Sequence, residues 1–514
     1  LMRQPHIMWR YLPLTNLLPR MVKSQKFKCL HTLSGVYPCK VINFILLYKN
    51  IHTKFLFKTE NDYLCIDKTR KSMQDKTICA IATANGGALG IIRISGAKAI
   101  KITDCIFHGR QMLSQAKGYT LHYGKIQDPE NGEIIDDVML SLFRAPHSYT
   151  GEDSIEISAH ASAYILQRIC QLLIKGGCSM AMPGEYTQRA FLNGKLDLTQ
   201  AEAVADLIAS NSAASHHLAM QQMRGGVSGK LTELRKRLLH LTSLLELELG
   251  FSDHEDLEFA DRTALLSLAN DISREIKRLS NSFEQGNAIK NGIPVAIIGA
   301  PNVGKSTLLN ALLQEERAIV SDIQGTTRDV IEETLNIDGI LFRFIDTAGI
   351  RHTTDTIEQL GIERSRKAAE KAKVIILMTE PGVPYPAIMP SDHQHVIHVI
   401  NKSDLADITA STDELHISAK QGTGLEALKQ KLRSTIQPSA TDEVLITNLR
   451  HKTALDQSLA DITAVIEAMS IGIPSDLIAE DLRQCLSHLA EITGGEITTN
   501  EVLGNIFSHF CIGK

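Results

Sequence analysis

The chain has 514 residues, too many for one hydrophobic core, and its 43% hydrophobic and 22% charged residues are typical of a soluble globular protein with two to four domains. No run of 18 or more apolar residues occurs, so no transmembrane helix is predicted. Residues 73–514 carry 41 Lys and Arg against 55 Asp and Glu, which excludes nucleic-acid binding by bulk electrostatics, so an RNA partner would need a local basic patch or a second subunit.

The first 72 residues differ from the rest, with 13 Lys and Arg against 3 Asp and Glu. Residues 1–59 lack acidic side chains and faintly resemble an organellar transit peptide, but they also lack its Ser-rich amphipathic character. Their abundant Lys, Asn, Ile, Phe, Leu and Tyr are the residues that AT-rich DNA encodes. We therefore favour a spurious or disordered extension, with Met73 as the natural beginning, over a transit peptide.

Residues 73–195 have the pattern of an α+β domain. Strands are predicted at 78–83 and 89–96, around a Gly-rich turn, and again at 138–143 and 154–160. A helix is predicted over 164–175, ended by two glycines.

Long amphipathic helices are predicted after Leu196, over 197–223 and 231–251, and helical periodicity returns over 451–514. Between these stretches lies a segment that alternates strands and helices. The simplest architecture is a helical domain in two parts, 196–291 and 438–514, with an α/β domain at 292–437 inserted between them.

Residues 299–306 read GAPNVGKS and match the G-x4-G-K-[ST] phosphate loop, between the apolar strand VAII and the helix TLLNALL. Glycines let backbone N–H groups turn toward phosphates at the positive end of a helix. Lys305 would reach the outer phosphates and Ser306 would bind Mg²⁺. Thr327, in GTTRD at 325–329, would give Mg²⁺ a second hydroxyl, and the DTAG motif at 346–349 belongs on the metal side.

Two further motifs predict that the base is guanine. Asp404, in NKSD at 401–404, can accept hydrogen bonds from the guanine N1 and 2-amino groups, which adenine does not offer. The SAK motif at 418–420 would donate backbone hydrogen bonds to O6. Hydrolysis, however, requires groups that these motifs lack, because Ile350 follows DTAG where a Ras-like protein has a water-orienting glutamine. Glu358 is the candidate for that task.

From about residue 77 to residue 514 the sequence resembles the MnmE (TrmE) family of tRNA-modification GTPases. The resemblance rests on GIIRISG at 90–96, SYTGEDSIEISAH at 148–160, the long stretch at 183–208, the GTPase motifs and the terminal FCIGK at 510–514. It implies a multidomain α/β fold with a Ras-like P-loop GTPase domain inserted in a helical domain, preceded by an α+β folate-binding domain at 73–195.

The resemblance also implies ligands and partners. It implies that 5-formyl- or 5,10-methylene-tetrahydrofolate binds at Arg93, Glu156, Lys195 and Lys514, and that K⁺, held by Asn302, Ser321, Ile323 and Thr326, replaces an arginine finger. It places Glu358 as the water-orienting residue when two GTPase domains pair, and it favours a role for Cys511 at the folate and tRNA site. The GTP-binding residues that motifs and resemblance imply are Gly299, Asn302, Val303, Gly304, Lys305, Ser306, Thr307, Ser321, Asp322, Ile323, Gln324, Gly325, Thr326, Thr327, Asp346, Thr347, Ala348, Gly349, Asn401, Lys402, Asp404, Ser418, Ala419 and Lys420.

The function that the resemblance implies is a homodimeric, potassium-stimulated GTPase. With the flavoprotein MnmG it would install a (carboxymethyl)aminomethyl group on carbon 5 of the tRNA wobble uridine, while GTP hydrolysis gates a conformational change. The alternative is a regulatory or ribosome-assembly GTPase without modification chemistry, which the GTPase domain alone would fit equally well. The nine cysteines form no CxxC pair and no metal-like spacing, as expected of reduced thiols in a cytoplasmic protein.

Overall fold

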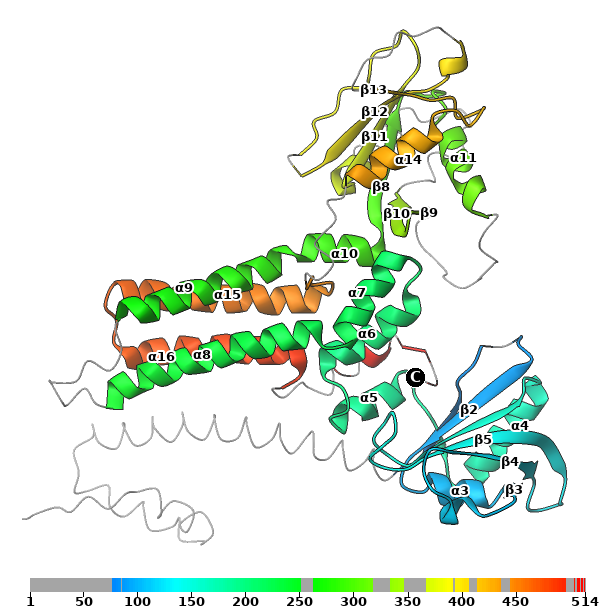
Figure 1. Ribbon diagram of the computed structural model, residues 1–514. Coiled ribbons are helices and arrows are strands. Elements are labelled where there is room, and N and C mark those ends of the chain that lie inside the picture. Colours follow the sequence, from blue (N-terminus) through cyan, green and yellow to red (C-terminus); the bar gives the residue numbers. More distant parts are fainter. Residues whose placement is uncertain are drawn as a thin grey trace, which may run out of the picture. The chain divides into compact units, whose positions relative to one another are not determined.

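The structure is a computed structural model that describes residues 76–84, 86–250, 262–317, 333–345, 367–391, 393–405, 414–435 and 444–495, together with residues 503, 506–508, 510, 511 and 513 (Figure 1). The predicted extension at 1–72 lies outside these residues. Within the described residues, no helix is both long enough and apolar enough to cross a membrane.

The amino-terminal domain is built on a seven-stranded sheet in the order β3-β4-β5-β6-β2-β1-β7, antiparallel except for the β1–β7 pair. Helices α3 (Ala99–Asp104) and α4 (Ala163–Lys175) cover one face, where alternate residues of β5 are buried. The strands are β1 (Ile78–Ile81), β2 (Leu89–Ser95), β3 (Phe107–Gly109), β4 (Thr120–Gln127), β5 (Ile134–Phe143), β6 (Ser154–His160) and β7 (Ser179–Met180).

Helices α5 (Glu185–Leu192), α6 (Leu198–Ala209) and α7 (Ala213–Met223) follow the sheet. The alanine-rich run at 197–223, predicted as helical throughout, is divided between α6 and α7. The physical reason is a capping box at Ser212, whose hydroxyl accepts from the Ser215 backbone N–H at 3.1 Å and starts a new helix.

Four helices form a bundle with one apolar core: α8 (Gly226–Gly250), α9 (Arg262–Asn281), α15 (Leu449–Ser470) and α16 (Ser475–Thr493). Its core unites residues 227–283 with residues 446–492, so the two helical stretches of the sequence fold together. The short α10 (Phe283–Asn291) leads out of α9, and the Ile446 N–H donates to the Ser282 hydroxyl at 3.0 Å. The chain therefore re-enters the helical bundle beside the point where it leaves the bundle.

The second sheet has six strands in the order β13-β12-β11-β8-β10-β9, parallel except for the β9–β10 pair. Parallel strands are expected to be apolar and buried on both faces, and β11 is buried along its whole length. The elements are β8 (Ile293–Gly299), α11 (Lys305–Arg317), β9 (Glu333–Ile337), β10 (Ile340–Phe344), β11 (Val374–Thr379), β12 (His395–Ile400), η4 (Ser403–Leu405), β13 (Glu414–His416) and α14 (Leu425–Ser434).

Candidate functional site

The predicted nucleotide motifs follow the carboxyl ends of parallel strands of the second sheet. The phosphate loop follows β8, NKSD follows β12, and SAK comes soon after β13. Because β8, β11, β12 and β13 run parallel, these ends share one edge of the sheet, where open α/β sheets bind their ligands.

The backbone of the phosphate loop has the tight turns that the glycines predict. Asn302 and Gly304 both have left-handed φ angles, of 63° and 95°. At Gly299 a Cβ atom would lie 2.5 Å from the carbonyl oxygen of Met378 on β11, so only glycine fits between these strands. The loop is thus held by the sheet before it enters α11.

Lys305 begins α11, and its ammonium donates to the carbonyl oxygens of Gly299 and Ala300, each at 2.9 Å. Burial lowers the pKa of this lysine, since the surroundings disfavour a charge. Ser306 follows it on the first turn of the helix, half-buried. The ammonium and the hydroxyl therefore lie where an anionic phosphate and its metal ion would be met at a helix amino terminus.

The Asn401 side chain joins three loops. Its amide donates to the Val303 carbonyl in the phosphate loop at 2.8 Å, and its oxygen accepts from the Ala419 N–H at 3.0 Å. Both bonds are buried. The loops that would hold phosphate and base are therefore fixed to each other by one side chain.

The residues predicted to recognise the base lie close to Asn401, since Asp404 is three residues on and Ala419 bonds to it. Asp404 is exposed in η4, with its carboxylate open to a base, whereas Ser418 and Ala419 are buried. Lys402 has a left-handed φ of 61° and pairs with Glu380. The structure thus brings the predicted phosphate-loop, NKSD and SAK residues together, with Thr307 and Lys420 exposed beside them.

Several predicted GTP, metal and catalytic residues lie outside the described residues, as does Ile350. They are Ser321, Asp322, Ile323, Gln324, Gly325, Thr326, Thr327, Asp346, Thr347, Ala348, Gly349 and Glu358. Lys514, predicted for folate, is also outside them.

In the amino-terminal domain, Arg93 and Glu156 are cross-strand partners in the register of β2 and β6. The guanidinium donates to Glu156 Oε1 from Nε at 2.9 Å and from Nη2 at 2.7 Å, and both side chains are about a quarter exposed, at 23% and 28%. The pair is a charge-assisted fork that leaves one carboxylate oxygen and part of the guanidinium available for a ligand.

Two tyrosines flank Arg93. The guanidinium carbon lies 5.9 Å from the ring centre of Tyr149 and 5.7 Å from that of Tyr186, and the Tyr186 hydroxyl donates to the Arg93 carbonyl at 2.8 Å. Burial raises the pKa of both hydroxyls. Sequence reasoning missed them as site residues, although both lie in the stretches that carry the family resemblance.

The carboxyl-terminal segment also contacts Arg93. The Gly513 carbonyl accepts from Arg93 Nη1 at 3.1 Å, and the Cys511 carbonyl accepts from the Gly184 N–H at 3.4 Å. The Cys511 thiol itself is exposed, while Phe510 is buried beside Gly184. The segment that precedes Lys514 therefore lies at the predicted folate residues.

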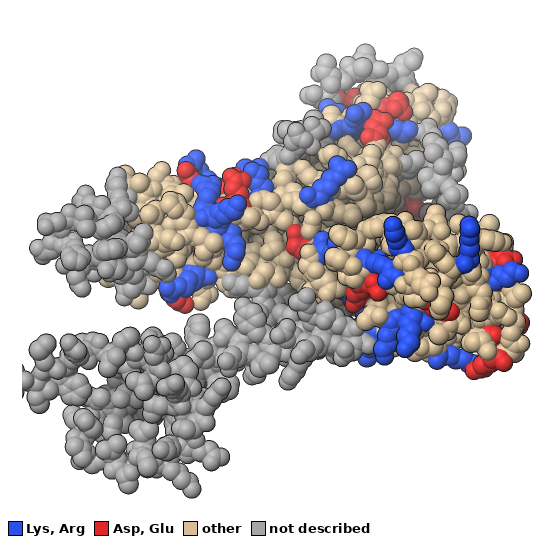
Figure 2. All heavy atoms as spheres, turned by 60° about the horizontal axis from the view of Figure 1, so that its bottom comes forward, with Lys and Arg blue, Asp and Glu red and all other residues tan. Residues whose placement is uncertain are grey.

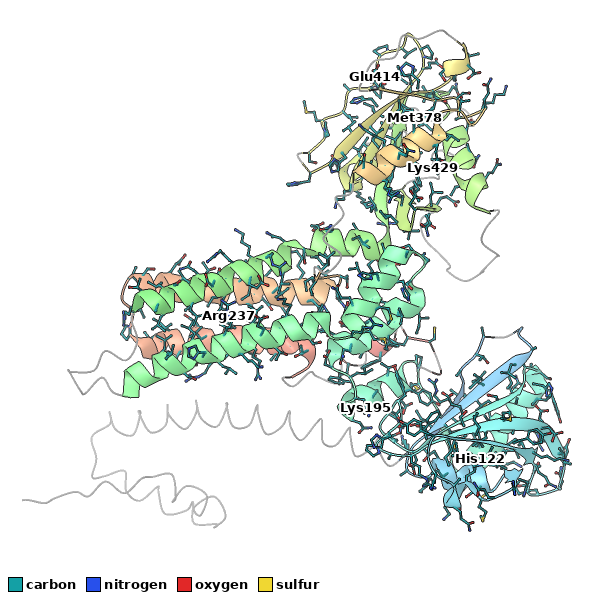
Figure 3. The ribbon with its side chains drawn as sticks, viewed as in Figure 1. His122, Lys195, Arg237, Met378, Glu414 and Lys429 are labelled. Atoms are coloured by element: carbon teal, nitrogen blue, oxygen red, sulfur yellow. The ribbon has the colours of Figure 1, made fainter. Side chains whose placement is uncertain are left out.

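Lys195, labelled in Figure 3, is connected to this region by a neighbouring loop. Its ammonium donates to the Pro146 carbonyl at 3.1 Å, and Asn193 donates to the Thr150 carbonyl at 2.8 Å. The loop between these two anchors carries Tyr149, which contacts Arg93. Lys195 thus touches the predicted site indirectly, with an exposed side chain.

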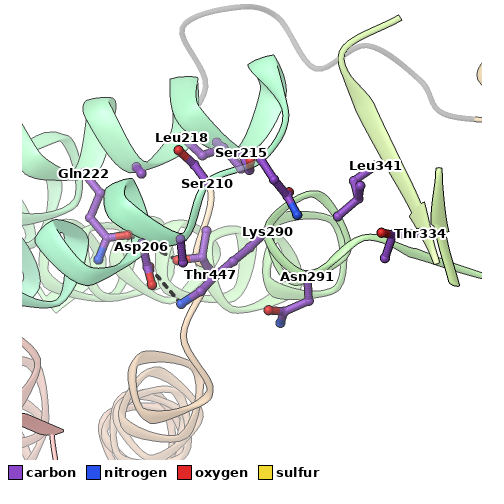
Figure 4. Close-up of a pocket in the computed structure, with 13 residues that line it drawn as sticks. Asp206, Ser210, Ser215, Leu218, Gln222, Lys290, Asn291, Thr334, Leu341 and Thr447 are labelled. Atoms are coloured by element: carbon purple, nitrogen blue, oxygen red, sulfur yellow. Dashed lines mark hydrogen bonds and ion pairs between the residues drawn. The ribbon is translucent and has the colours of Figure 1, made fainter. Parts of the chain in front are cut away.

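A cavity of about 250 Å³ lies where α6, α7 and α10 meet β9 and β10 (Figure 4). Asp206 and Lys290 form an ion pair of 2.8 Å in its wall. Burial raises the pKa of Asp206, and Lys290 opposes that shift. Because Lys290 lies in the last turn of α10, which leads into β8, the pair joins α6 to the segment before the phosphate loop.

The parallel sheet, its glycine-rich loop before a helix and the Asn401-linked base loop together define a P-loop nucleotide-binding protein. A family model described as the MnmE helical domain matches residues 198–511, and one described as the GTP-binding protein TrmE N-terminus matches residues 77–195. The chain belongs to the MnmE (TrmE) family.

Curated relatives agree with this assignment. The tRNA modification GTPase MnmE of Bacteroides fragilis is 54% identical over 469 residues, covering 86% of this chain and 100% of the relative. The proteins of the same name from Bacteroides thetaiotaomicron and Flavobacterium johnsoniae are 53% and 50% identical, over 86% and 85% of this chain and 100% and 99% of their own length. The predicted family is therefore confirmed.

Proposed function

We propose that this chain is a potassium-stimulated GTPase that acts in tRNA modification. With the flavoprotein MnmG, it would install a (carboxymethyl)aminomethyl group on carbon 5 of the wobble uridine. In this proposal residues 292–437 form a GTPase domain inserted in a helical domain of residues 196–291 and 438–514, and residues 73–195 bind the folate. GTP hydrolysis gates a conformational change and is separate from the group transfer itself.

The observation that carries the GTPase part is the bridge made by Asn401. Its two buried hydrogen bonds hold the phosphate loop and the SAK loop in one arrangement, beside the exposed carboxylate of Asp404. Such preorganisation suits a guanine nucleotide, because the base and the phosphates must be bound at a fixed separation. Ser306 and Thr327 would hold Mg²⁺, and the K⁺ ligands would be Asn302, Ser321, Ile323 and Thr326.

The folate part is supported by the surroundings of Arg93. A guanidinium fits the glutamyl carboxylates of a tetrahydrofolate, and the free carboxylate oxygen of Glu156 fits its pterin N–H edge. Bound there, the folate would supply the one-carbon unit. Lys195 would orient the loop that carries Tyr149, and Cys511 and Lys514 would lie beside the ligand.

A homodimer is supported by the face of the first sheet that α3 and α4 leave open. Three apolar side chains on this face are 68%, 66% and 43% exposed, namely those of Leu121, Tyr123 and Met139. In the strand register Leu121 pairs with Ser141 and Ser141 pairs with Glu156, so this surface adjoins the predicted folate residues. Exposed apolar surface of this kind commonly marks a protein interface. A second copy of the chain would cover it and approach the folate residues.

The potassium assignment is tested by GTP turnover in matched K⁺ and Na⁺ salts. We expect turnover to fall strongly in Na⁺, because the smaller ion would not fit ligands spaced for K⁺ and so would not hold a positive charge where an arginine finger would act. Nucleotide affinity, measured in parallel, should change much less. Equal turnover in the two salts would contradict the assignment.

The modification activity is tested by analysing the wobble-uridine nucleosides of cells that lack this chain. We expect the carbon-5 modification to disappear and to return when the gene is restored. A variant with Asn401→Ala should not restore it. An unchanged nucleoside profile would instead favour a regulatory GTPase without modification chemistry.

A further inference from the structure

One strip of the amino-terminal domain is strongly basic. Residues 94–127 hold five lysines and arginines and only one acidic residue, Asp104, although residues 73–514 as a whole are acidic. We call the surface made by α3, by η3 (Leu113–Gln115) and by the residues that flank α3, β3 and η3 the basic ridge. Its four exposed cations are Lys98, Lys101, Arg110 and Lys117.

The single acidic side chain does not neutralise this ridge. The Asp104 carboxylate accepts from the backbone N–H groups of Leu113 at 2.6 Å and Ser114 at 3.0 Å, and so ties α3 to η3. Lys125 faces Asp137 across the β4–β5 pair and is left out of the ridge for that reason. In the part of the chain that the structure describes, the four ridge cations have no ion-pair partner.

The ridge is also a firm surface. The Arg144 guanidinium donates to the carbonyls of Leu113, Ser114 and Ala116, at 2.9 to 3.1 Å, and so holds η3 in place. Lys98 is the N-cap residue of α3, and Lys101 follows it within the helix. Figure 2 shows Lys and Arg side chains, with Asp and Glu side chains among them, over the amino-terminal domain.

We propose that the basic ridge binds the phosphate backbone of tRNA. The proposal rests on the function proposed above and names the surface that meets its RNA substrate. Four uncompensated cations on a rigid support match a repeating phosphate chain. Binding of an acidic protein surface in place of RNA is an outcome that the test below distinguishes.

The test compares tRNA affinity of the unaltered chain with that of a variant carrying Lys98→Ala, Lys101→Ala, Arg110→Ala and Lys117→Ala, between 50 and 200 mM salt. Each lost phosphate contact should lower the slope of log affinity against log salt by about 0.7 to 0.9, so the slope should fall by about 3. Affinity should fall at least about tenfold at 0.1 M salt. GTP turnover without tRNA should stay unchanged.

A matched control removes four exposed cations from α8 and α9, by Arg235→Ala, Lys236→Ala, Arg274→Ala and Lys277→Ala. Equal losses in the two variants, unaltered tRNA binding by the ridge variant, or no tRNA binding by the unaltered chain would each overturn the proposal. Retained tRNA binding with lost binding of the flavoprotein partner would overturn it in favour of a protein surface. The nucleoside analysis decides the proposed function independently, because it compares cells with and without the whole chain.

Discussion

The side-chain amide of Asn401 bonds to two loops that are 98 and 18 residues away from it in the chain. Asn401→Ala would leave the Val303 carbonyl and the Ala419 N–H without partners, at about 1–3 kcal/mol each. We expect guanine-nucleotide affinity to fall by about ten- to a hundredfold or more, as measured by titration with a fluorescent GDP analogue. Asp404→Ala is the comparison variant. It should lower guanine-nucleotide affinity without lowering the midpoint of unfolding, whereas Asn401→Ala should lower both. Unchanged affinity in Asn401→Ala would contradict the bridging role.

Glu358 lies outside the described residues, so its assignment as the water-orienting residue stays a prediction. Glu358→Ala should abolish GTP hydrolysis while leaving GTP binding intact, because a group that orients water acts on the transition state and not on the bound nucleotide. Turnover and affinity are measured on the same preparation. If affinity falls together with turnover, the residue has a structural role.

Arg93 and Glu156 were predicted from sequence, and their proximity follows from strand register, since they face each other across β2 and β6. The remaining neighbours could not be predicted in the same way. Gly513 is 420 residues from Arg93, and no local pattern encodes a contact between a backbone carbonyl and so distant a guanidinium. Tyr186 is fully buried, and burial of a tyrosine against an arginine depends on tertiary packing.

At the scale of elements, the periodic segments were predicted best. The strand predicted at 154–160 is β6, and the helix predicted at 164–175 is α4 with one more residue at its start. The division of the run at 197–223 was missed because its alanines favour helix on both sides. The break depends on Ser212, whose short side chain competes for backbone N–H groups and caps a helix more readily than it continues one.

Glu202 of α6 connects three helices. Its carboxylate pairs with Arg450 at 2.9 Å and His451 at 2.7 Å on α15, and Arg450 also donates to the carbonyls of Glu491 and Ile492 in α16. Burial raises the pKa of Glu202, but hydrogen bonds from His451 and Arg450 and their charges outweigh it and lower the pKa to about 2. The ionised carboxylate is therefore favoured in the folded protein.

This pKa predicts an acid-sensitive contribution to stability. Because the folded value lies below the ordinary value of 4.5, the contribution is complete above about pH 4.5 and is lost as pH falls toward 2. Its size is about 3 kcal/mol. Urea unfolding between pH 6 and pH 3 should show about 2 kcal/mol of this loss in the unaltered protein, because pH 3 is still above the folded pKa, and a much smaller loss in Glu202→Gln. Parallel pH profiles for the two proteins would contradict the assignment.

At the scale of the whole molecule, the bundle is predicted to fold without residues 292–443. Its core takes residues from both sides of that segment, and Ile446 bonds to Ser282, so a short linker could join Asn291 to Val444. Such a shortened chain should keep the helical circular dichroism of the bundle and cooperative unfolding. A chain ending at residue 437 is the matched control, and it should lose both because α15 and α16 are removed. Loss of the bundle in the shortened chain would contradict an independent helical domain.

The two-part helical core was the simplest interpretation of the sequence, but the place where the chain returns was not predictable. Gly286 marks it, because a Cβ atom there would lie 2.2 Å from the Ile446 carbonyl oxygen. A glycine within a short helix usually indicates weak helix formation. Here the glycine lets the backbone of α10 contact the backbone at Ile446, and neither segment alone reveals that contact.

The bond between Arg93 and Gly513 has a consequence for synthesis. A ribosome that adds roughly 5–20 residues per second needs about 20–80 s to travel the 420 residues between them. The seven-stranded sheet can form long before that, with the guanidinium of Arg93 held only by Glu156 and two tyrosines. A nascent chain would therefore carry a folded but incomplete form of the proposed folate site until residue 513 emerges, and premature termination near residue 500 would leave the seven-stranded sheet without the contact that Gly513 makes to Arg93.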